Sequence, residues 1–128
     1  MASEHEQQFP GNIRIHEKAC LLLDKHLISL VLLRMPGNSL LLWIGDLKEG
    51  SDLEFNDLSL ALFGSCTSLL GDNVNTDSKQ LSDRIARRFN QGRPVYVSLN
   101  IKAADCSTVN VQLALEKLVN EFVGKSLI

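Results

Sequence analysis

Two neighbouring apolar runs, separated by one short turn, constrain the fold more than any other feature of this sequence. Leu27–Leu33 and Leu40–Ile44 are apolar at nearly every position. Between them lies Pro36-Gly37, which suits the two central positions of a type II turn, because proline presets φ and glycine accepts a positive φ. We therefore predict two antiparallel strands joined by a tight connection.

These two strands lack the alternation that marks a sheet with one solvated face. Both faces of the predicted strands therefore favour burial. About 500 Å² of exposed apolar surface would leave about 12 kcal/mol of burial unrealised, and such patches usually mark partner surfaces. We predict that a second chain buries one face. The alternative is that the N-terminal strand or the long loop after Ile44 folds over it.

The remaining pattern predicts further strands and two helices. Alternation from Asn12 indicates a strand, and β-branched or short apolar runs predict others at 58–63, 67–70 and 94–101. A helix should begin at Asp77, with a four-residue apolar stripe, and a second after Ser107 or Thr108. Gly92 and Gly124 are the expected helix ends.

Strands in a run followed by helices favour an α+β fold. We predict a mostly antiparallel sheet of about six strands with two main helices packed on one face. The length of 128 residues suits one domain. We expect residues 1–11 to be a flexible N-terminal tail and residues 12–128 to be a single α+β domain.

Composition argues against several classes of partner. The net charge is −2, so no overall basic bias would attract a nucleic acid. No apolar run approaches the ~20 residues of a membrane span, and the N-terminus lacks the pattern of a signal peptide. Cys20, Cys66 and Cys106 are widely spaced, which is typical of reduced thiols in a cytoplasmic or nuclear protein.

No motif indicates catalysis, and we expect no catalytic residue, cofactor or metal site. The sequence has neither GxxxxGK[ST] nor GxGxxG, so a phosphate-binding loop is missing. Cys66 has no base nominated by spacing, and His16 and His26 are scattered rather than paired as zinc ligands usually are.

Two charged segments could orient a protein partner. Residues 46–57 carry five acidic side chains against a single lysine. The predicted first helix carries Arg84, Arg87 and Arg88, with Arg93 just beyond it. Two interpretations stay open: the arginines form a solvated helix face that suits the helix dipole, or they grip an acidic partner.

Four segments in order carry a family resemblance. They are Leu41-Leu-Trp-Ile-Gly45, Thr67-Ser-Leu-Leu-Gly-Asp72, the helix residues Leu81 and Arg84–Arg88, and Val95-Tyr-Val-Ser-Leu-Asn100. From about Leu40 to Ile101, roughly half of the chain, the sequence resembles the proteasome assembly chaperone 4 family.

The resemblance implies a non-enzymatic chaperone built on an antiparallel sheet with helices packed on it. Such a chaperone pairs with a proteasome assembly chaperone 3-like subunit, binds proteasome α-type subunits and promotes assembly of the α-ring of the 20S core particle. We expect Trp43, with its strand neighbours Leu42 and Ile44, to contact the paired chaperone. We expect Arg84, Arg87 and Arg88 to contact an α-subunit. The isolated chain could form a homodimer. The alternative is a small α+β adaptor or scaffold unrelated to the proteasome.

Overall fold

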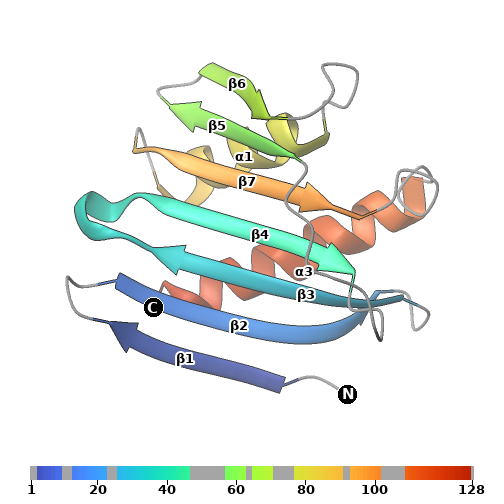
Figure 1. Ribbon diagram of the computed structural model, residues 1–128. Coiled ribbons are helices and arrows are strands. Elements are labelled where there is room, and N and C mark those ends of the chain that lie inside the picture. Colours follow the sequence, from blue (N-terminus) through green and yellow to red (C-terminus); the bar gives the residue numbers. More distant parts are fainter. Residues whose placement is uncertain are drawn as a thin grey trace.

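The described elements of the computed structural model form one mixed sheet with both described helices on the same side (Figure 1). The structure describes residues 3–9, 13–22, 26–46, 57–62, 65–70, 77–90, 93–101 and 109–127. In chain order the elements are β1 (Ser3–Phe9), β2 (Ile13–Leu22), β3 (His26–Arg34), the 3-10 turn η1 (Pro36–Asn38), β4 (Leu40–Asp46), β5 (Leu58–Leu62), β6 (Ser65–Leu70), α1 (Asp77–Phe89), β7 (Val95–Asn100) and α3 (Val109–Ser126).

The strand order in the sheet is β1-β2-β3-β4-β7-β5-β6. Every neighbouring pair is antiparallel except β4 and β7, which are parallel. The parallel pair arises because the chain leaves β4, builds β5, β6 and α1, and then returns beside β4. The α+β class and the mostly antiparallel sheet are therefore confirmed, with one parallel pair that the sequence pattern did not indicate.

The core lies between the sheet and the two helices. Alternate residues of the central strands point toward α1 and α3 and are buried, which is the two-residue period expected of strands. α1 packs over β5 and β7, and α3 crosses behind β2 and β3 (Figure 1). The fully buried large side chains are Ile28, Leu30, Leu32, Leu40, Leu42, Ile44, Ile85, Val95, Val97, Val119 and Val123.

The β3–β4 connection has the predicted turn. The main-chain N–H of Asn38 donates to the carbonyl of Met35 over 3.2 Å, and Gly37 has φ 80° and ψ 8°, as the third position of a type II turn requires. Asn38 also has a positive φ, 62°, and asparagine tolerates this region better than most residues. Pro36-Gly37 therefore fixes the register of the two apolar strands.

Two boundaries differ from the sequence-based expectation. Residues Ser3–Phe9 form β1, an edge strand, where a tail was predicted; its register runs from Ser3↔Ala19 to Phe9↔Ile13. The sequence of β1 is polar and lacks the apolar alternation that predicts a strand. The strand is instead defined by its main-chain pairing with β2. In addition, α3 continues past Gly124 to Ser126. Gly92 and residues 102–108 lie outside the described residues.

Candidate protein-binding site

The sheet has a second face on which the structure places neither of its two described helices (Figure 1). We call this the open face. On β3, the leucines that alternate with the buried residues point to this side, and most open-face side chains are partly exposed. Its apolar members, taken from strand register, include Ile15, Ala19, Leu21, Leu27, Val31, Leu33, Leu41, Trp43, Leu60 and Tyr96.

Trp43 lies near the centre of the open face, on β4. Its register partners are Val31 on β3 and Ser98 on β7. The indole extends along its own strand over Gly45: a Cβ placed on that glycine would lie 2.5 Å from Cζ2 and 3.0 Å from Cζ3 of the indole. No side chain other than hydrogen fits beneath the ring, so glycine at this position sets how the tryptophan is presented.

Leu21 and Leu27 form the most exposed apolar pair of the open face. They lie directly opposite each other on β2 and β3. Their exposed fractions are 40% and 42%. Adjacent exposed leucines on a sheet face are unfavourable in water, and their burial against another surface would be favourable.

The prediction that Leu42 and Ile44 contact a partner needs correction. Both side chains have 0% exposure and point into the core. The sequence of β4 does not show which side chains point inward, because its inward-pointing and outward-pointing positions are both apolar. Of the three predicted strand residues, only Trp43 lies on the open face.

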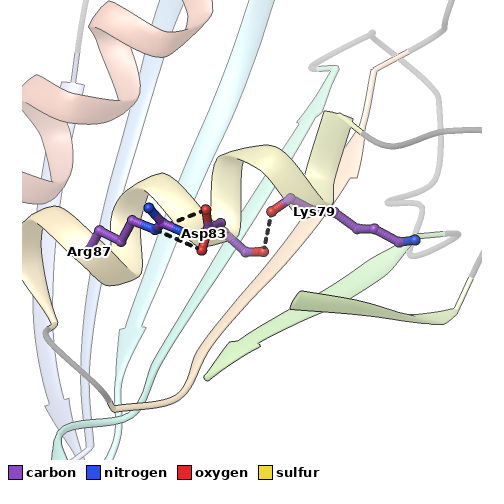
Figure 2. Close-up of polar contacts among 4 residues, drawn as sticks. Lys79, Asp83 and Arg87 are labelled. Carbon is purple, nitrogen blue, oxygen red and sulfur yellow. Dashed lines mark hydrogen bonds and ion pairs between the residues drawn. The ribbon is translucent and has the colours of Figure 1, made fainter. Parts of the chain in front are cut away.

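The arginines of α1 do not act as one patch. Arg84 donates from Nη1 to Oε2 of Glu116 over 2.7 Å and so links α1 to α3. Arg87 pairs with Asp83 one turn earlier, with Nε 3.2 Å from Oδ1 and 3.1 Å from Oδ2; Figure 2 shows these two side chains facing each other along the helix. Both guanidinium groups therefore already have a carboxylate partner.

Arg88 behaves differently from the other two. Its guanidinium carbon lies 5.4 Å from the centroid of the Phe89 ring, within cation–π range. The side chain is exposed. Sequence spacing grouped the three arginines, but only the structure shows which of them makes no ion pair with a described carboxylate.

Within the described part of the chain, the thiols and imidazoles belong to no cluster that could hold a metal ion. Cys20 is buried in the core; this burial raises the pKa of its thiol, while the nearby charge of Lys18 partly opposes the rise. Cys66 is exposed on β6, and Cys106 lies outside the described residues. Nε2 of His16 is buried without a hydrogen-bond partner.

Buried polar groups elsewhere serve the fold. The carboxylate of Asp57 is buried before β5 and accepts the main-chain N–H of Leu99 over 3.1 Å. The hydroxyls of Ser59 and Ser78 lie 2.6 Å apart between β5 and α1. The predicted acidic loop falls mainly on residues 47–56, which lie outside the described residues. Neither described helix has the length and hydropathy required to cross a membrane.

A small α+β domain with an apolar sheet face and basic side chains on the helical side fits the class of protein-binding modules. Residues 27–101, more than half of the chain, match the protein family described as proteasome assembly chaperone 4. The matched segment runs from β3 through β7 and includes α1. The chain therefore belongs to the proteasome assembly chaperone 4 family, and the resemblance found in the sequence is confirmed. A comparison with curated proteins gives no match.

Proposed function

We propose that this chain is one half of a heterodimeric chaperone that assembles the α-ring of the 20S core particle. The family is one of proteasome assembly chaperones. The open face packs against a structurally similar, proteasome assembly chaperone 3-like subunit. The pair binds α-type subunits while the ring forms, and stronger contacts between subunits then displace it.

The open face carries the first part of the proposal. Trp43, Leu21 and Leu27 lie on a sheet surface away from both described helices. Two twisted sheets can pack face to face with their inner side chains interdigitated. A stable interface buries roughly 800 Å² on each partner, which a face spanning several strands can supply. The same surface would make the isolated chain self-associate at micromolar concentration, which light scattering can measure.

A non-enzymatic mechanism is consistent with the chemistry of the described side chains. His16 and Cys20 lie on β2, whereas the exposed Cys66 lies on β6, which does not neighbour β2 in the sheet. The chaperone would act stoichiometrically by covering an α-subunit surface that is later used within the ring. Assembly in the cytoplasm or the nucleus would suit the free, exposed thiol of Cys66, since thiols stay reduced there.

Affinity purification of the tagged full chain, followed by mass spectrometry, tests this proposal. The expected bound chains are a second small chaperone and α-type subunits, recovered without the mature 20S particle. Recovery of signalling or vesicle-traffic complexes with no α-type subunit would instead establish an adaptor, because an apolar sheet face alone serves either role.

A further inference from the structure

A pocket of about 470 Å³ lies on the helical side of the molecule, at the end of the sheet where the β3–β4 turn meets the C-terminal ends of α1 and α3. It is separate from the open face, because Arg34 and Leu40 in its wall point toward the helices. Its lining residues are Arg34, Asn38, Leu40, Arg88, Phe89, Asn90, Arg93 and Leu127. We propose that this arginine pocket binds the carboxylates of an acidic segment of a partner polypeptide.

The charge of the pocket is one-sided. Among the residues that the structure describes, its lining contains three arginines and no acidic side chain. Within the described part of the chain, no carboxylate lies within 4.0 Å of Arg34, Arg88 or Arg93, in contrast to the paired Arg84 and Arg87. Glu116 and Glu121 line a second hollow that Arg88 also borders, and neither of them makes an ion pair with Arg88.

A fourth arginine strengthens the argument. Arg14 on β2 lies directly opposite Arg34 on β3. Like charges at directly opposed positions of a sheet destabilise it. Neither arginine makes an ion pair with a described carboxylate side chain, so an anion placed beside Arg34 would relieve the repulsion as well as form new hydrogen bonds.

The pocket wall is held in place by hydrogen bonds. Nδ2 of Asn90 donates to the carbonyl oxygens of Asn38, over 2.9 Å, and of Pro94, over 3.2 Å. Nη1 of Arg93 donates to the carbonyl of Gly37 over 3.0 Å. These contacts join the β3–β4 turn to the segment after α1, so the guanidinium of Arg93 is positioned before any ligand arrives, which lowers the entropic cost of binding.

The apolar part of the lining favours a polypeptide over a small anion. Leu40, Phe89 and Leu127 lie beside the arginines. Guanidinium groups form charge-assisted, often bidentate hydrogen bonds with carboxylates. An acidic segment can place glutamate or aspartate on the arginines and an apolar side chain on these three residues, whereas inorganic phosphate would leave the apolar surface uncovered.

The test is an NMR titration of the isotope-labelled full chain with three probes. They are an acetylated and amidated glutamate–leucine–glutamate tripeptide, its glutamine–leucine–glutamine counterpart, and inorganic phosphate. The acidic tripeptide should shift the side-chain Nε–H signals of Arg34, Arg88 and Arg93 in a saturable manner. The glutamine peptide should not bind, and phosphate should bind more weakly. The acidic peptide should also lose affinity as salt is raised.

Matched arginine variants locate the binding. Arg34→Gln with Arg88→Gln should weaken the acidic tripeptide by on the order of tenfold, if each exposed pair contributes up to about 1 kcal/mol. The control, Arg84→Gln with Arg87→Gln, removes two arginines with internal partners and should leave the affinity within about twofold. Equal weakening by the two double variants, equal binding of the glutamine peptide, or phosphate binding as tight as the acidic peptide would overturn the proposal. Loss of α-subunit capture is not part of this test, so its result is independent of the proposed function.

Discussion

Leu41 and Leu42, adjacent on β4, give a matched pair of substitutions that separates the core from the open face. Leu42 has 0% exposure and lies in the core cluster, so Leu42→Ala removes buried methyl groups and leaves a cavity, at a cost of about 2–5 kcal/mol. Leu41 is partly exposed on the opposite side of the strand. Leu41→Ala loses only part of that burial, so we expect a cost of about 1 kcal/mol.

Equilibrium urea unfolding of the two variants measures these costs, with the fluorescence of Trp43 as the probe, since it is the single tryptophan of the chain. Urea midpoints should separate clearly, because several kcal/mol is a large part of the stability of a small domain. Leu41→Ala should weaken capture of the paired chaperone although the variant remains folded. Relative to the unfolding free energy that each variant loses, capture should fall more for Leu41→Ala than for Leu42→Ala. Equal destabilisation by the two alanines would refute the assignment of the two strand faces.

Three further substitutions test single features of the fold. Gly45→Ala should displace the Trp43 indole and change its emission, because the added Cβ would lie 2.5 Å from Cζ2 of the ring; an unchanged spectrum would contradict the ring position. Gly124→Ala should raise the free energy of unfolding by about 1 kcal/mol, because alanine favours a helix interior more than glycine does. The new methyl group would lie 3.6 Å from Cε1 of Phe89 on α1, which is an ordinary contact. A loss of stability would show that the two helices cannot accommodate the methyl group. Asp57→Ala should cost about 1–3 kcal/mol by leaving the buried N–H of Leu99 without its acceptor, with Asp57→Asn less harmful; thermal melts that match the wild type would refute this role.

Local chemistry in the sequence was enough to predict most elements. Pro36-Gly37 predicts the turn whose dihedral angles the structure has, and the apolar stripe of Leu81, Ile85 and Phe89 predicts the inner face of α1. β1 was not predicted, because it pairs with β2 through the main chain and has no apolar side-chain pattern. Gly124 was interpreted as a helix end, although tertiary packing carries the helix through it.

The candidate sites were less accessible to sequence reasoning. The apolar character of β4 indicated that both faces of the strand favour burial, but an uninterrupted apolar run cannot show which positions point outward. Leu42 and Ile44 were therefore expected at the partner contact, although they lie in the core. The arginine pocket could not be predicted at all. Arg34, Arg88 and Arg93 come from segments far apart in the sequence, and only the meeting of a turn with two helix ends brings them together.

The central claim is that a partner chain packs on the open face, and a matched pair of exposed leucines tests it most directly. Leu27 is 42% exposed on the open face, and Leu113 is 61% exposed on α3, on the helical side. Each is replaced by glutamate in the tagged full chain, and the amount of co-purified small chaperone is measured by quantitative mass spectrometry. We predict that Leu27→Glu loses the chaperone while Leu113→Glu retains it. Retention of the chaperone by Leu27→Glu at the wild-type level would contradict the account.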